Sequence, residues 1–263
     1  MLTAALHLAL PGAALVCAMM FLLWLLHLRT GNASIVDPGW AFGLPLLAIT
    51  YAVLGSGQAW RRWLLAGMAV VWGVRLGTHL LLRMVGKPEE GRYQELRRQW
   101  KTHLAVKFLV FFEFQALLDL LLSVPFLLAA LNPQSSFSPL ELAGFALWLL
   151  ALAGETVADT QLAAFKRDAL HAQVCQRGLW NYSRHPNYFF EWLIWVAWAV
   201  FALASPHGWI AVVCPLLMFY FLFRVTGIPA TESQALRSKG EAYRVYQHST
   251  SAFVPWFKRA AQP

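Results

Sequence analysis

Seven long apolar segments constrain this chain more than any other feature of its sequence. Short polar breaks separate them, and apolar runs of this length satisfy their backbone polar groups inside a bilayer only as helices. None shows the strict alternation of a membrane β-barrel strand. The sequence therefore predicts an all-α integral membrane bundle of seven transmembrane helices. The expected spans are residues 4–28, 40–55, 62–83, 106–131, 139–163, 187–205 and 208–225.

The composition is also that of a membrane protein. Of the 263 residues, 59% are hydrophobic and 13% are charged, whereas soluble domains average about 45–50% apolar and about 25% charged residues. These values exclude a disordered chain and argue against an ordinary soluble enzyme. The length suits one compact domain, so residues 1–263 are expected to form a single transmembrane domain. The N-terminal apolar stretch lacks a basic leader and is interpreted as a retained span.

The net charge of +8 is distributed unevenly over the polar breaks. Seven Lys and Arg residues lie in 83–107, four in 166–186 and six from 224 onward, whereas 132–139 and 205–207 contain none. Because cytoplasmic loops are enriched in Lys and Arg, the pattern predicts an outside N-terminus and a cytoplasmic C-terminus. Arg61 and Arg62 are exceptions on the outer side. The basic excess is assigned to topology and to an anionic ligand, and no nucleic-acid partner is expected.

Ionisable side chains inside the expected spans are costly to insert, so each needs a partner or a function. Two hypotheses account for them: interhelical salt bridges, or a polar cavity that opens to the cytoplasm and holds a large anionic cofactor. Several share one helix face at intervals of three or four residues. They gather near the expected cytoplasmic ends of four spans: Arg75, His79, Arg83, Glu155, Asp159, Lys166, Asn187, Glu191 and Arg224.

A second polar cluster lies between the first two spans. Asp37 precedes Pro38 at the mouth of the second span, where it is interpreted as a helix N-cap, as a cavity residue, or as both. The fourth span contains Glu113, Gln115 and Asp119, for which structural pairing is favoured over ligand contact.

The motifs of soluble enzymes are missing from the sequence. It has no P-loop, nucleophile elbow or His-Glu-x-x-His pattern. Eight scattered histidines and three distant cysteines predict neither a metal site nor a disulfide framework. Two Gly-x-x-x-Gly pairs, Gly39/Gly43 and Gly73/Gly77, predict close packing of helices and nothing more.

The carboxyl half carries strings that are similar to a known enzyme family. It reads Gly-Leu-Trp-Asn-Tyr-Ser-Arg-His-Pro-Asn-Tyr at 178–188, then Glu191 and Glu232, Gly-Glu-Ala-Tyr-Arg-Val-Tyr at 240–246 and Ala-Phe-Val-Pro-Trp-Phe at 252–257. This resembles the membrane steroid 5-alpha-reductase family, most closely a bacterial branch once labelled a domain of unknown function. The resemblance is strong from about 150 to 257 and weaker before it. Sterol C14-type reductases and isoprenylcysteine or phospholipid methyltransferases carry related strings, so the strings indicate a cofactor pocket more firmly than one reaction.

The resemblance implies a seven-helix bundle in the bacterial inner membrane, with NADPH held from the cytoplasmic side by the half from about 150 to 257. Guanidinium groups suit its phosphates because they bind them in a bidentate manner. Glu155 departs from the Asn of the family. The cofactor contacts expected from the resemblance and from the basic stripe of the third span are Arg75, Arg83, Glu155, Asp159, Lys166, Tyr182, Arg184, His185, Asn187, Glu191 and Arg224.

The resemblance also implies a pair of acids at the substrate carbonyl, a Glu before the second span and a Tyr on the third. Asp37 takes the place of the Glu. Trp72 takes the place of the Tyr, and because an indole cannot donate an acidic proton, His79 is the nearest candidate donor. Trp40 and Trp72 are expected to line the substrate pocket.

Together these implications predict NADPH-dependent reduction of a carbon–carbon double bond conjugated to a ketone. A lipophilic substrate, such as a 3-oxo-Δ4 steroid, would reach the pocket from the membrane lipid and leave as its 5-alpha-reduced product. The alternative is a membrane methyltransferase that uses S-adenosylmethionine and needs fewer cations for phosphates. A transporter or a lipid-binding scaffold is a third class, but the sequence shows neither inverted repeats nor broken midplane helices.

Overall fold

The computed structural model describes residues 2–168, 174–225 and 227–258. Within these residues the regular structure is helical, apart from one isolated parallel bridge between Ser183 and Ser251, in agreement with the predicted all-α class. The chain forms two compact units. The first unit is Met1–Ser138 with Ala202–Ala211, and the second unit is Pro139–Phe201 with Val212–Pro263. The single transmembrane domain over 1–263 stays a prediction.

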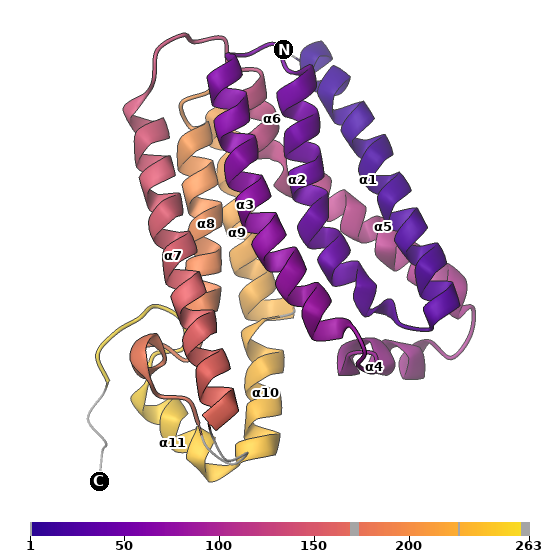
Figure 1. The fold of residues 1–263 in the computed structure, drawn as a ribbon, viewed down its shortest axis with the longest axis vertical. Helices are drawn as coiled ribbons and strands as arrows, with labels where there is room; N and C mark the ends of the chain where they lie inside the picture. Colours follow the sequence, from indigo (N-terminus) through magenta and orange to yellow (C-terminus); the bar gives the residue numbers. More distant parts are fainter. Residues whose placement is uncertain (1, 169–173, 226, 259–263) are drawn as a thin grey trace. The chain divides into compact units, whose positions relative to one another are not determined.

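Long helices that run side by side make up the first unit (Figure 1). The short helix α4 lies at the end of the unit where α1 and α3 terminate and α2 begins (Figure 1). Asn32 makes the turn into α2, because its side chain accepts a hydrogen bond from the Ser34 backbone N–H at 2.9 Å. The helices are α1 (Leu2–Thr30), η1 (Ala33–Ile35), α2 (Val36–Leu54), α3 (Ala59–Met84), α4 (Gly91–Trp100), α5 (Leu104–Leu122) and α6 (Val124–Ala130), and the short η3 (Gly208–Val212) lies largely in the same unit.

The second unit is built around two long helices in close contact, α7 (Pro139–Asp168) and α8 (Pro186–Ala202). A Cβ at Gly144 of α7 would lie 2.8 Å from the Ala197 carbonyl oxygen of α8, so the backbones approach closely at this glycine. The segment before α8 packs on α7, because the Trp180 indole N–H donates to the Ala158 carbonyl oxygen at 2.9 Å. The remaining elements are η2 (Gly178–Asn181), α9 (Val213–Tyr220), the π-helical turn η4 (Phe221–Val225), α10 (Ile228–Lys239) and α11 (Glu241–Ser249).

Five segments among the described residues are long and apolar enough to cross a membrane: Leu2–Thr30, Ala33–Leu54, Ala59–Met84, Pro139–Asp168 and Gly208–Lys239. They overlap five of the seven predicted spans, and Gly208–Lys239 extends well beyond the predicted 208–225. The predicted span 106–131 is divided between α5 and α6, and α5 carries three charged residues; the span 187–205 corresponds to α8, which has 17 residues. The apolar helices support a membrane protein, whereas the count of seven spans and the orientation stay predictions.

The two predicted glycine pairs bring helices of the first unit into close contact. A Cβ at Gly73 would lie 2.7 Å from the Ala41 carbonyl oxygen, and one at Gly77 would lie 2.6 Å from the Phe42 ring. Gly43, on α2, leaves room for the carboxyl group of Asp119 on α5. Asp119 is fully buried, and neither of its carboxyl oxygens has a hydrogen-bond partner in the described chain. The polar pairing predicted for Asp119 is therefore wrong within the described chain, where its carboxyl group packs against Gly43.

The structure also explains the two arginines that disagree with the charge pattern expected for the predicted outer side. Arg61 is fully buried and donates to the carbonyl oxygens of Gln134 at 2.7 Å and Ser136 at 3.0 Å. Arg62 donates to the carbonyl oxygen of Ala52 at 2.6 Å, near the C-terminus of α2. Arg61 thus satisfies carbonyl oxygens of the loop between α6 and α7, and Arg62 satisfies one at the end of α2, so both arginines belong to the fold of the first unit.

Candidate functional site

The first candidate site surrounds Asp37, in the first turn of α2. The Tyr93 hydroxyl donates a hydrogen bond to Asp37 Oδ1 at 2.6 Å, and the Arg92 guanidinium forms an ion pair with Oδ2. The N-cap residue of α2 is Ile35, and no side chain caps this helix. The N-cap interpretation of Asp37 is therefore wrong, because its carboxylate is held by α4 instead.

Two further contacts fix α4 against the turn that precedes α2. The backbone N–H of Ala33 donates to Glu89 Oε1 at 2.7 Å, and that of Glu90 donates to Ser34 Oγ at 2.9 Å. Arg97 then binds Glu89 through its Nε at 2.8 Å. These polar contacts determine the position of Tyr93, whose ring is 2% exposed.

The surroundings of Tyr93 favour its protonated form. Burial, followed by the negative charge of Asp37, raises the pKa of the Tyr93 hydroxyl well above its ordinary value. Arg92 also contacts Glu90, with 3.3 Å between Nε and Oε2, so the carboxylates of Asp37 and Glu90 share one cation. This cluster, Asp37 with Glu90, Arg92 and Tyr93, presents a buried hydroxyl donor beside a carboxylate whose charge is compensated.

Tyr93 is the residue that sequence reasoning missed. The structure pairs Asp37 with Tyr93, whereas His79, the candidate donor, is exposed on α3. The only sequence signal for Tyr93 is an aromatic hydroxyl inside the basic break 86–103, directly after Arg92. The rest of the expected first-unit set lies along α2 and α3. Trp40 and Trp72 meet edge to face with ring centroids 5.9 Å apart, Arg75 is half-buried, and Arg83 forms an ion pair with Glu90.

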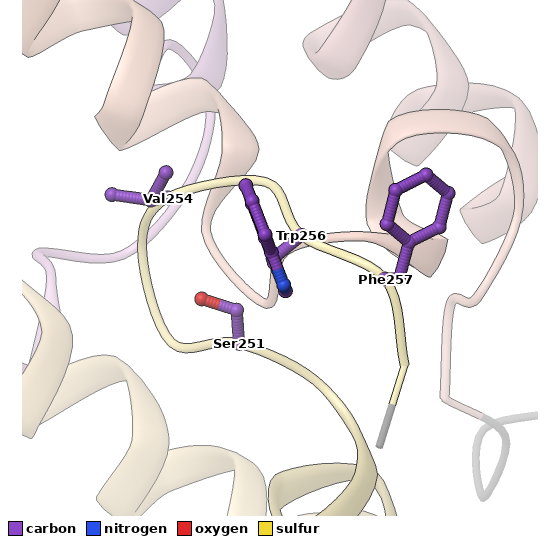
Figure 2. A pocket seen from close by; sticks show the side chains of 4 residues that line it. All are labelled: Ser251, Val254, Trp256 and Phe257. Atoms are coloured by element: carbon purple, nitrogen blue, oxygen red, sulfur yellow. The ribbon is translucent and has the colours of Figure 1, made fainter. Parts of the chain in front are cut away.

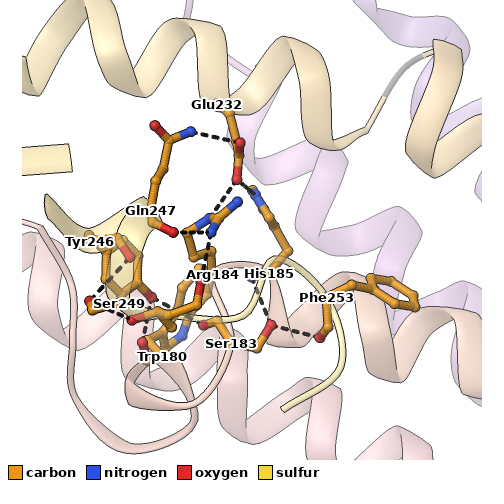
Figure 3. Close-up of polar contacts among 10 residues, drawn as sticks. Trp180, Ser183, Arg184, His185, Glu232, Tyr246, Gln247, Ser249 and Phe253 are labelled. Carbon is orange, nitrogen blue, oxygen red and sulfur yellow. Dashed lines mark hydrogen bonds and ion pairs between the residues drawn. The ribbon is translucent and has the colours of Figure 1, made fainter. Parts of the chain in front are cut away.

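The second candidate site, in the second unit, is centred on Arg184 and Glu232 (Figure 3). Arg184 Nε donates to Glu232 Oε1 at 2.7 Å, and His185 Nε2 lies 3.2 Å from the same oxygen. The other carboxylate oxygen accepts from Gln247 Nε2 at 2.8 Å. Glu232 therefore joins the segment before α8 to α10 and α11. The sequence strings include Glu232 but assign it no role, and no sequence pattern points to Gln247.

Backbone bonds complete this network (Figure 3). Arg184 Nη1 donates to the carbonyl oxygens of Gln247 at 2.9 Å and Thr250 at 2.6 Å, at the end of α11. Ser183 Oγ donates to the Phe253 carbonyl oxygen at 2.7 Å. The tyrosine hydroxyl of Tyr246 donates to the Ser183 carbonyl oxygen at 3.1 Å. The segment 180–185 and the C-terminal segment thus form one hydrogen-bonded layer.

A family model described as "Protein of unknown function (DUF1295)" matches residues 23–250. The chain belongs to the DUF1295 family. This family is related to steroid 5-alpha-reductase-like proteins. No curated protein and no solved structure gives a match.

In this DUF1295 protein, the other expected cofactor residues of the second unit are spread over α7, the segment before α8, α8 itself and η4. Asn187 Nδ2 donates to Asp159 Oδ1 at 3.4 Å, and Glu191 accepts from the Trp195 indole N–H at 3.0 Å. Glu155 is 4% exposed. Lys166, Tyr182 and Arg224 are exposed.

These residues include the groups that a phosphate-bearing cofactor needs, namely the exposed cations Lys166 and Arg224 and the amide of Asn187. Arg184 differs, because its guanidinium already donates to Glu232 and to two carbonyl oxygens. Its contacts give Arg184 and His185 a scaffolding role, and direct contact of either with a cofactor stays a prediction.

Proposed function

We propose that this chain is a membrane-embedded, NADPH-dependent reductase of a carbon–carbon double bond conjugated to a ketone in a lipophilic substrate. The observation that carries the proposal is the contact between Tyr93 and Asp37, with 2.6 Å between the hydroxyl oxygen and Oδ1. Reduction of an enone develops negative charge on the carbonyl oxygen, and a buried hydroxyl is suited to stabilise it. An ion pair between Arg92 and Asp37 that served structure alone would not require a buried tyrosine hydroxyl on the same carboxylate.

Tyr93, Asp37 and Arg92 each have a distinct part in this reaction. When bound, NADPH supplies a hydride to the carbon beta to the ketone. As electrons move onto the carbonyl oxygen, Tyr93 donates its proton to that oxygen and becomes a phenolate. The alpha carbon of the enol then takes a proton from solvent while the enol hydroxyl returns its proton to the Tyr93 oxygen, which restores both the ketone and the acid. Tyr93 carries one proton, so the carbonyl oxygen must replace Asp37 as its acceptor. Arg92 then remains to neutralise the Asp37 carboxylate.

The surroundings of this cluster support a lipophilic substrate. Trp72 is fully buried, and Trp40 meets it edge to face, so the interior between α2 and α3 near Asp37 is aromatic and apolar. Both helices are apolar enough to cross a membrane. A 3-oxo-Δ4 steroid, or another enone lipid that partitions from the bilayer, fits this chemistry. NADPH is proposed to bind from the cytoplasmic side through Lys166, Asn187 and Arg224.

A membrane methyltransferase that uses S-adenosylmethionine is the second candidate. One observation favours it. Two of the arginines expected to hold phosphates, Arg83 and Arg184, are bound to Glu90 and Glu232 instead. A cofactor without phosphates would need fewer cations.

The first experiment measures binding of NADPH and of S-adenosylmethionine to the protein in lipid nanodiscs by calorimetry. The reductase proposal expects saturable NADPH binding that S-adenosylmethionine does not displace. Binding of S-adenosylmethionine alone would refute the reductase and support the methyltransferase.

The second experiment tests the acid pair with the variants Tyr93→Phe and Asp37→Asn, using progesterone as the 3-oxo-Δ4 probe and the loss of nicotinamide absorbance as the readout. Loss of the acid should lower turnover by about 10²–10⁴-fold and leave the NADPH dissociation constant unchanged. Tyr220→Phe is the matched control, because Tyr220 is 57% exposed on α9. If Tyr93→Phe retains full turnover, or if both variants lose NADPH binding equally, the assigned roles are wrong.

A further inference from the structure

The last described segment of the second unit forms a small aromatic pocket that the proposed reaction does not use. Its lining residues are Ser251, Val254, Trp256 and Phe257, and its volume is about 230 Å³. Trp256 is 68% exposed and Phe257 is 75% exposed. Figure 2 shows Trp256 next to Ser251, with Val254 and Phe257 on either side. Two large aromatic side chains thus face solvent outside the candidate membrane spans.

The backbone holds this exposed segment in place. The Trp256 backbone N–H donates to the Tyr182 carbonyl oxygen at 2.9 Å, and the Arg184 N–H donates to the Ser251 carbonyl oxygen at 2.8 Å. The Phe257 and Tyr182 rings meet edge to face, with centroids 6.1 Å apart. The backbone that carries Trp256 is therefore fixed before any ligand binds, which lowers the entropic cost of stacking a flat ring on the indole.

Positive charge lies beside the aromatic side chains. Lys258 directly follows Phe257, and its Nζ donates to Gln176 Oε1 at 2.6 Å. Gln176 directly precedes Arg177, so this bond places Lys258 beside the segment that carries Arg177. The Arg177 side chain is 68% exposed. Arg177 forms an ion pair with Asp168 at 4.0 Å, and because both side chains are exposed this interaction is weak. A flat aromatic face, a hydroxyl group and two cations are together the chemistry that binds a nucleoside phosphate.

We propose that this pocket binds the adenine base of the nucleotide cofactor, stacked on the Trp256 indole, with the phosphate-bearing ribose directed to Lys258 and Arg177. The inference rests on the proposed function and adds to it a subsite for the half of the cofactor that takes no part in hydride transfer. A shallow pocket with a hydroxyl and neighbouring cations suits a flat heterocycle, whereas a lipid chain would require a long apolar groove.

The test compares NADPH with reduced nicotinamide mononucleotide, which lacks the adenosine half, on the full chain in nanodiscs by calorimetry. Trp256→Ala should weaken NADPH binding at least about tenfold, the scale of one lost base stack, and leave the mononucleotide unchanged. Trp256→Phe should recover most of the affinity. Trp209→Ala is the matched control, because Trp209 is also 68% exposed but lies in η3.

Each other outcome has a definite meaning. Unchanged NADPH affinity in Trp256→Ala overturns the subsite, and so does an equal loss for both nucleotides. If the unaltered protein binds neither nucleotide, the proposed function fails together with the subsite, which separates that failure from failure of the subsite alone.

Discussion

Replacement of Glu232 by Gln tests whether Arg184 is a scaffold residue. Glu232 accepts from Arg184, His185 and Gln247, and the Glu232 and Arg184 side chains are only 16% and 11% exposed. Loss of one partner from a buried ion pair costs about 3–5 kcal/mol, and partial exposure reduces this figure. Because Gln keeps one acceptor oxygen, we expect a loss of about 2–3 kcal/mol in the free energy of unfolding.

The assay is thermal unfolding of the protein in one detergent, followed by tryptophan fluorescence. In a chain of this size about 1 kcal/mol shifts the melting temperature by about 2–4 °C, so Glu232→Gln should lower it by about 4–12 °C. Glu241→Gln is the matched control. Its carboxylate binds Arg244 at 3.2 Å, but the two side chains are 75% and 66% exposed, and the change should stay within about 0.5 kcal/mol.

The same variant distinguishes the two roles of Arg184. If Arg184 is a scaffold residue, Glu232→Gln lowers the melting temperature and weakens NADPH binding, because α10, α11 and the segment before α8 separate. If Glu232 instead keeps Arg184 from binding a cofactor phosphate, Glu232→Gln frees the Arg184 guanidinium. NADPH binding then becomes tighter, and the melting temperature stays unchanged. The second result would refute the reasoning.

Two further predictions concern the first unit. Gly43→Ala places a Cβ against the Asp119 carboxyl group, so overpacking should destabilise the protein by about 1–3 kcal/mol despite better helix propensity. Asp119→Ala should restore stability in the double variant. Additive losses of the two variants in thermal unfolding would contradict this. The raised pKa of Tyr93 means that the folded chain keeps this proton after the unfolded chain loses it at about pH 10. The melting temperature should therefore show no Tyr93-linked loss below pH 10 and a decrease above it that Tyr93→Phe lacks; an equal decrease in both proteins would contradict it.

The sequence predicted the helical class and the packing role of the glycine pairs, because both depend on local properties. Apolar runs in lipid must close their backbone hydrogen bonds within one segment, and small residues permit close approach wherever helices meet. The charge pattern, by contrast, treated Arg61 and Arg62 as exceptions to topology. The carbonyl oxygens that Arg61 contacts lie 71–75 residues further along the chain, and no local sequence pattern encodes such contacts.

The candidate site shows the same division. The sequence identified Asp37 from its position before an apolar run, and the string around Arg184 from its resemblance to a family. It did not identify Tyr93 or the role of Glu232, which lie 56 and 48 residues from their partners. Residue type and local spacing determined that this chain would be an apolar helical protein with polar groups at helix ends. Only the tertiary structure decided which of those groups meet, because an ion pair or a buried hydrogen bond depends on distances set by the packing of whole helices.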